Sequence, residues 1–155
     1  MKLICGVLAL ATVPVAFAAS NAPYPKSNVA AFVFEKLDAT TLPSAIGPRR
    51  AKGKKTFADY GYTARLLDEN RAHLESSPDV APINLRVLDQ QSSGIFVCID
   101  SQSKDENIGE FQRVFLLKLK NPDSLLKGKE SSKEFAGCPA IGIDPATEGG
   151  SAYGG

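Results

Sequence analysis

One histidine, one glutamate and one arginine have residue types and a spacing that could support acid–base chemistry. His73, the single histidine of the chain, and Glu75 are two residues apart, so in a β-strand their side chains project from the same face. A hairpin with a short loop at residues 68–70 would place Arg65 opposite His73 and Thr63 opposite Glu75. A base, an acid and a cation would then share one polar face of a sheet.

This set of side chains suits phosphodiester cleavage, in which one group moves a proton and a cation stabilises the phosphate. Small exported ribonucleases use a carboxylate, a histidine and an arginine on an antiparallel sheet, so a ribonuclease-like phosphodiesterase is one hypothesis. The alternative is that this face is only the solvated side of the sheet. The sequence contains no serine nucleophile elbow, phosphate-binding loop, zinc-binding helix or dinucleotide fingerprint, and so no complete catalytic set.

A second candidate site is the densest run of positive charge in the chain, between residues 49 and 55. The run could be a dibasic processing site, a patch that binds anionic groups, or a loop whose basic residues only keep it soluble. Together with Tyr60 and Tyr62 it forms the predicted contact surface of a binding module, unless both tyrosines lie in the core. The basic residues of the run are Arg49, Arg50, Lys52, Lys54 and Lys55.

The N-terminal 18 residues have the pattern of a secretory signal peptide. An apolar run ends at Ala16-Phe17-Ala18, a small-x-small pattern, and cleavage is expected after Ala18 or Ala19. The run contains Pro14 and is shorter than the roughly 20 residues that a spanning helix needs. We therefore expect a soluble mature chain that is secreted or periplasmic, with a length that suits one domain.

Loss of the signal peptide would leave two cysteines, Cys98 and Cys138. An even pair in an oxidising compartment predicts a disulfide, and closing a loop of about 40 residues contributes about 4 kcal/mol in the chain-entropy model. A buried free thiol beside a separate reactive one is the alternative. Two cysteines and one histidine are too few for a zinc site, and no metal or cofactor is expected. The acidic segment 100–107 matches a calcium loop in composition only, because Lys104 occupies a ligand position.

The formal net charge of the full chain is only +1 at pH 7, which argues against bulk electrostatic binding of nucleic acid. A local basic patch could still bind a protein, or an anionic glycan or lipid at the cell surface. The leading hypothesis is therefore an exported, disulfide-tied, non-enzymatic binding or interaction module of unknown ligand.

Alternating apolar and polar residues predict a mainly β fold that positions these candidates. Strands are expected at residues 29–37, 56–66, 71–76 and 111–120, with a central hairpin over 83–100 whose polar link is 91–94. Asn121, Pro122 and Gly128 predict a short helix between them, and residues 131–136 could form another. The sheet would be antiparallel with about six strands, curled or split into a barrel or sandwich; an α+β fold with a partly helical 38–55 loop is the alternative.

The expected domain organisation has four parts. Residues 1–18 are the signal peptide, 19–27 an extended lead-in, 28–141 a single β-rich domain, and 142–155 a Gly-rich, disordered tail. Within the domain, apolar residues on both faces of the second strand of the hairpin indicate a central strand. The disulfide would then fasten the C-terminal segment across the face that carries Phe96.

Overall fold

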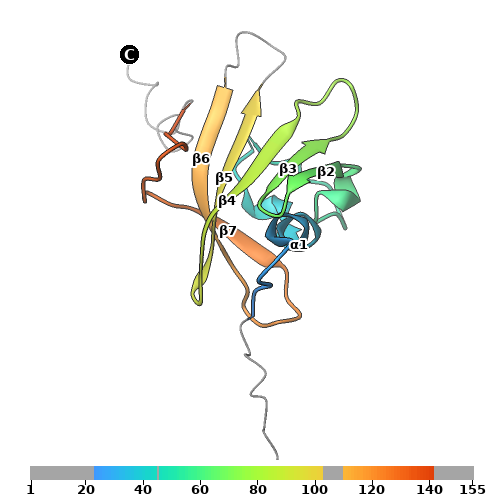
Figure 1. The fold of residues 1–155 in the computed structure, drawn as a ribbon. Coiled ribbons are helices and arrows are strands. Elements are labelled where there is room, and N and C mark those ends of the chain that lie inside the picture. The colour runs from blue at the N-terminus through green and yellow to red at the C-terminus, as the bar shows by residue number, and fades with distance from the viewer. Residues whose placement is uncertain (1–22, 45, 103–109, 142–155) are drawn as a thin grey trace, which may run out of the picture.

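The computed structural model describes residues 23–44, 46–102 and 110–141. The predicted signal peptide and its cleavage site, the predicted tail and most of the acidic segment 100–107 lie outside these residues. Within them the chain forms one α-helix and a seven-stranded sheet with the order β1-β7-β6-β5-β4-β3-β2. The sheet is curled into a half-barrel, and α1 packs against one of its faces (Figure 1).

The prediction of a mainly β fold is confirmed, but its details change. The strands pair antiparallel except for β1 and β7, which are parallel, so the sheet is mixed and has seven strands in place of about six. The elements in chain order are α1 (Val29–Lys36), β1 (Leu37–Asp38), η1 (Ala39–Thr41), η2 (Ala58–Tyr60), β2 (Thr63–Asp68), β3 (Arg71–Glu75), β4 (Ile83–Gln91), β5 (Gly94–Gln102), β6 (Glu110–Lys118) and β7 (Leu126–Glu130).

The predicted central hairpin is β4–β5, and β5 is the middle strand of the sheet, as expected from its two apolar faces. Ile95, Val97 and Ile99 are fully buried on the inner face, which packs against α1. Phe96 and Cys98 are buried on the outer face. A strand that is buried on both faces in this way is the rigid centre from which the other elements take their positions.

Residues 29–37, predicted as a strand, instead form α1 and then the short strand β1. Val29, Ala30 and Val33 are buried, and a spacing of one and four residues places them on one side of a helix. The same small apolar residues also alternate along the sequence, so periodicity alone could not decide between helix and strand. The helix ends where the N–H of Leu37 donates to the Val33 carbonyl oxygen, and the chain then pairs with β7.

The helix predicted from Asn121 to Gly128 is wrong, because this segment forms a turn and then β7. The hydroxyl of Ser124 accepts from the N–H groups of Lys120 and Asn121, at 3.0 and 3.1 Å, and this closes the turn. Leu126 is then completely buried between β1 and β6. Pairing on both sides of β7 outweighs the local helix-starting signals.

The edge strand β2 differs from its prediction at both ends. Residues 58–60 form the 3₁₀ helix η2 and Gly61 turns the chain with a φ of 83°, so the strand begins at Thr63 and not at residue 56. At its other end, Asp68 pairs with Arg71 after a β-bulge, which leaves a two-residue turn in place of the predicted three-residue loop. Asn70 closes this turn without a left-handed backbone, because its φ is not positive. As an edge strand, β2 is mostly exposed and not half-buried.

Residues 131–135 form no helix or strand and residue 136 begins a turn, so the second predicted helix is also wrong. The N–H of Ser131 donates to the carbonyl oxygen of Val114 at 2.9 Å, which continues the edge pairing of β6. Phe135 packs on Phe96, with ring centroids 5.3 Å apart. This contact between Phe135 and Phe96 holds the segment against the outer face of the sheet.

Candidate functional site

The outer face of the sheet carries a row of polar residues that lie directly opposite one another on five strands. The β2–β3 register is as predicted, with Arg65 opposite His73 and Thr63 opposite Glu75. Sequence reasoning found the first two members of the row and missed the others, because the registers of the longer connections cannot be derived from one hairpin. The row consists of Arg65, His73, Asn84, Asp100 and Gln112.

Hydrogen bonds hold His73 at both ring nitrogens. Nε2 lies 2.9 Å from Glu75 Oε1, and Nδ1 lies 2.6 Å from Asn84 Oδ1. The Asn84 amide is oriented by its Nδ2, which donates to Asp100 Oδ1 at 2.6 Å, since a carboxylate can only accept. Both ring nitrogens therefore lie within hydrogen-bonding distance of side-chain oxygens.

This geometry joins His73 and Glu75, two of the three predicted catalytic residues, to Asn84 and Asp100 in a cross-strand network. The side chain of His73 is 18% exposed, and neither ring nitrogen is free to take a proton from a substrate unless it first leaves its partner. Arg65 is exposed on the edge strand and has no hydrogen bond or ion pair to any described residue. The three residues are thus neighbours, and their catalytic role stays a prediction.

Asp59 anchors the C-terminal end of the basic loop, residues 49–55. Its carboxylate Oδ2 accepts from the backbone N–H groups of Thr56, at 2.8 Å, and Lys55, at 2.9 Å. These two bonds hold the pKa of Asp59 below its usual range, with the bond from Thr56 as the largest cause. The Lys55 carbonyl oxygen accepts from the N–H of Ala39 at 2.8 Å, which ties the loop to the chain just after β1.

Tyr60 holds the middle of the same loop. Its hydroxyl accepts from the N–H of Ala51 at 3.1 Å and donates to the Lys54 carbonyl oxygen at 3.4 Å. Gly53 turns the loop with a φ of 80°, and the Lys54 ammonium lies 5.6 Å from the centroid of the Tyr60 ring. The half-buried Tyr60 therefore fixes the backbone conformation of the loop through its hydroxyl.

The basic side chains of this loop remain at the surface. All five are exposed, and none forms an ion pair with a carboxylate among the described residues. The fixed backbone and the free charges together make a preformed cationic surface. Its members are Arg49, Arg50, Lys52, Lys54 and Lys55.

Tyr62, the second tyrosine of the predicted contact surface, lies in the core. Only 6% of the residue is exposed, and its ring packs edge-on against Phe57 with centroids 5.2 Å apart. Burial raises the pKa of its hydroxyl. The alternative that the tyrosines lie in the core is therefore correct for Tyr62. Its buried ring is not available to a binding partner.

Acidification is expected to loosen the basic loop at Asp59. A lowered folded-state pKa means that the carboxylate stabilises the folded loop above the ordinary value of 3.8, and that this stabilisation is lost as the pH falls through the lowered pKa. The backbone amide signals of Lys55 and Thr56 should therefore titrate below pH 3.8 in NMR spectra. Asp59→Asn should abolish that titration, whereas Asp123→Asn, a change in another exposed turn, should preserve it. Amide signals that stay constant would contradict this role.

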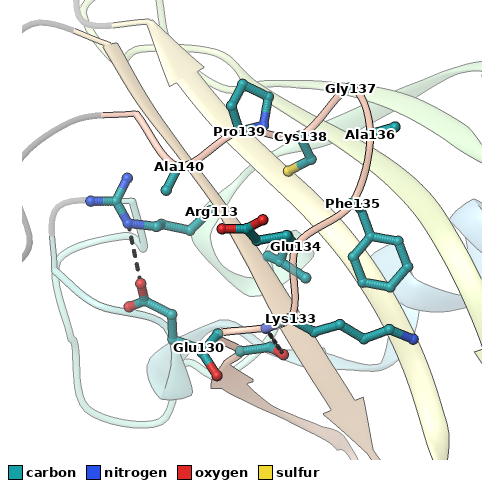
Figure 2. A pocket seen from close by; sticks show the side chains of 13 residues that line it. Arg113, Glu130, Lys133, Glu134, Phe135, Ala136, Gly137, Cys138, Pro139 and Ala140 are labelled. Atoms are coloured by element: carbon teal, nitrogen blue, oxygen red, sulfur yellow. Dashed lines mark hydrogen bonds and ion pairs between the residues drawn. The ribbon is translucent and has the colours of Figure 1, made fainter.

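The C-terminal segment 131–141 arches over the outer face and encloses a cavity of about 880 Å³ (Figure 2). Its two ends are bound to β6 through the N–H of Ser131 and both backbone groups of Ile141. The predicted disulfide is confirmed: Cys98 of β5 is bonded to Cys138 of the arch, with Cα atoms 6.0 Å apart. The bond fastens the segment across the face that carries Phe96, as expected.

Three charged groups of the cavity wall, Arg113, Glu130 and Lys133, have partners within the chain. Arg113, only 8% exposed, pairs through Nε with Glu130 Oε1 at 3.2 Å, an ion pair drawn in Figure 2. The ammonium of Lys133 lies 4.6 Å from the ring centroids of both Phe96 and Phe135. Sequence reasoning missed Arg113, although a charge in the otherwise apolar inner row of β6 was a usable signal. The wall therefore serves to hold the arch in place.

Two further expectations concern membranes and metals. No helix in the described ranges is long and apolar enough to cross a bilayer. These ranges also contain no group of three His, Cys, Asp or Glu residues that could hold a metal ion. The predicted calcium-like segment lies largely outside them, and Asp100 at its start accepts a hydrogen bond from Asn84.

Comparison with known proteins gives no relative from which a function could be transferred. The chain matches no protein-family model, no curated protein and no solved structure. Its function is therefore inferred from its own residues and their geometry.

Proposed function

We propose that the chain is an exported, disulfide-tied binding module without enzymatic activity, and that its ligand is an anionic glycan at the cell surface. The observation that carries this proposal is the basic loop, which displays five exposed cations on a backbone held by Asp59 and Tyr60. The signal-peptide pattern and the paired cysteines support export.

The construction of the loop favours binding over a merely solvating role. A loop that only needs to be soluble has no need for a fixed backbone, whereas a preorganised loop loses less conformational entropy when a ligand binds. Asp59, the carboxylate at the end of the loop, is engaged by backbone N–H groups, and of the five basic side chains only Lys54 interacts with its charge, as the smallest cause of its lowered pKa. Sulfate and carboxylate groups of a glycan would supply the missing negative charge.

The test is binding of the purified mature protein to heparin, used as a sulfated glycan. The variant Arg49→Ala/Lys52→Ala should bind about two- to thirtyfold more weakly and elute at lower salt, since each of the two exposed ion pairs contributes about 0.2–1 kcal/mol. The control Lys26→Ala/Arg71→Ala removes the same charge elsewhere and should elute like wild type. Absence of binding by the wild type, or equal loss in both variants, would refute the proposal.

The ribonuclease-like phosphodiesterase remains a second candidate because of the register that joins Arg65, His73 and Glu75 on one face. The hydrogen bonds at both nitrogens of His73 weigh against it. RNA cleavage by the purified protein, measured from pH 4 to 9, separates the two functions. We expect no cleavage; activity with a bell-shaped pH dependence that His73→Ala abolishes would establish the enzyme instead.

A further inference from the structure

The β6–β7 hairpin carries a second group of exposed lysines. Lys118 on β6 lies directly opposite Lys127 on β7, so two positive charges are neighbours on the same face of the sheet. Lys129 lies two residues further along that face, and Lys120 follows β6 just before the turn. All four are exposed. Like charges placed directly opposite each other on paired strands destabilise the sheet, so their presence suggests a role outside folding.

Nearby carboxylates do not neutralise these lysines. Asp38, which pairs with Lys127 in the sheet, accepts from both the backbone N–H and the hydroxyl of Thr40. Glu130, at the end of β7, is paired with Arg113. Both acids are used to stabilise the fold. Asp123, the exposed carboxylate of the turn, forms no ion pair with a described residue, so four lysines stand against one free carboxylate and the hairpin keeps a net positive charge.

The sheet brings this hairpin next to the basic loop. β7 pairs with β1, where Lys127 lies opposite Asp38, and Asp38 in turn forms a β-bridge with Thr56. Thr56 directly follows Lys55, the last residue of the loop. Three strand spacings therefore separate Lys118 from Thr56, a distance of about 14 Å at about 4.8 Å per strand. Two basic segments that are far apart in the sequence thus meet at one edge of the sheet.

We propose that the hairpin lysines and the basic loop form one continuous binding band for a linear sulfated or carboxylated polysaccharide. This inference rests on the proposed function of the loop and extends it: the ligand is a chain long enough to contact both segments. Lysine is suited to this task because its flexible stem carries a point charge that can meet anionic groups at irregular spacing.

The surroundings of the band favour a glycan over a membrane or a nucleic acid. Membrane attachment combines basic residues with apolar side chains that insert, but no large apolar side chain of β6 or β7 is exposed beside the hairpin lysines. The exposed leucines Leu66 and Leu67 lie instead on β2, the strand that follows the basic loop after η2. Single-stranded nucleic acid is bound through aromatic side chains on which bases stack. Phe115, an aromatic of the hairpin, is completely buried on the inner face. Tyr60, the aromatic of the loop, is partly buried and is held by its hydrogen bonds to Ala51 and Lys54, with the Lys54 ammonium over its ring.

The test uses heparin oligosaccharides of two lengths, a tetrasaccharide and a dodecasaccharide, with affinities measured by calorimetry. Wild type should bind the longer one more tightly. Lys118→Gln/Lys127→Gln should lose about tenfold in affinity for the dodecasaccharide and little for the tetrasaccharide, and its salt dependence should fall by about one unit of slope per lysine removed. Removal of the repulsion between the two lysines should leave the Tm unchanged or raise it.

Two controls separate this inference from the proposed function of the loop. Arg49→Ala/Lys52→Ala should weaken binding of both oligosaccharides, and Lys26→Gln/Arg71→Gln should change neither. If the hairpin variant binds the dodecasaccharide like wild type while the loop variant does not, the band is refuted and the loop proposal stands. If wild type binds neither oligosaccharide, or prefers anionic vesicles or RNA, the glycan assignment fails for both.

Discussion

Cys138→Ser is expected to lower the free energy of unfolding by about 4 kcal/mol. The disulfide closes a loop with a sequence separation of 40 residues, and the chain-entropy model assigns a loop of that size about this stabilisation. The substitution also releases the arch from β5, which exposes the Phe96–Phe135 pair to water. Urea unfolding at neutral pH without reductant measures the change as a lower transition midpoint.

Reductant provides the internal control for this prediction. Wild type treated with dithiothreitol should unfold at nearly the midpoint of Cys138→Ser, because both lack the cross-link. Ser132→Ala, an exposed change in the same arch, should keep the wild-type midpoint. A wild-type protein that is insensitive to reductant, or that shows two titratable thiols when isolated without it, would contradict a stabilising disulfide.

Phe57→Ala is expected to cost about 3–5 kcal/mol, because it empties a completely buried aromatic position. Phe57 packs edge-on against Tyr62, and its carbonyl oxygen accepts from the N–H groups of Tyr60 and Tyr62, at 3.1 and 3.0 Å. The cavity would therefore lie directly under the basic loop. A thermal melt should show a Tm lower by roughly 10–20 °C.

Tyr60→Phe is the matched control, since it removes the hydroxyl that bonds Ala51 and Lys54 but leaves the ring in place. This variant should melt within a few degrees of wild type and bind heparin more weakly, because only the shape of the loop changes. Phe57→Ala should lose both stability and binding. Equal melting of wild type and Phe57→Ala would show that the core does not depend on this side chain.

These predictions connect the fold to the proposed surface. The disulfide holds the arch on the outer face, and Phe57 with Tyr62 supports the loop from the inner core. The arch and the loop are thus stabilised by different parts of the molecule. Loss of the disulfide should therefore affect glycan binding less than loss of Phe57 does, at temperatures where both variants remain folded.

The sequence by itself determined the features that depend on neighbouring residues or on simple arithmetic. Two β-branched, apolar runs around a polar link defined the β4–β5 hairpin, and apolar residues on both faces of its second strand defined the central strand. In the β2–β3 hairpin, a one-residue slip would have mixed polar and apolar residues on each face, which settled Arg65 opposite His73. Only one pairing was available to the two cysteines that remain after residue 18, and Cys98–Cys138 is the bond observed. These signals are local or compositional, so they can be recognised in the sequence before the fold is known.

The tertiary structure decided what depends on pairing between distant segments. Apolar residues at 29–36 alternate in a way that is compatible with a strand, but burial against the curled sheet makes this segment a helix. Leu126 lies in a strand because β1 and β6 pair with it on both sides. The hairpin lysines likewise lie next to the basic loop only because β7 lies between β6 and β1. Which strands become neighbours is set by the burial of the whole core, and that free energy is not encoded in any short stretch of the chain.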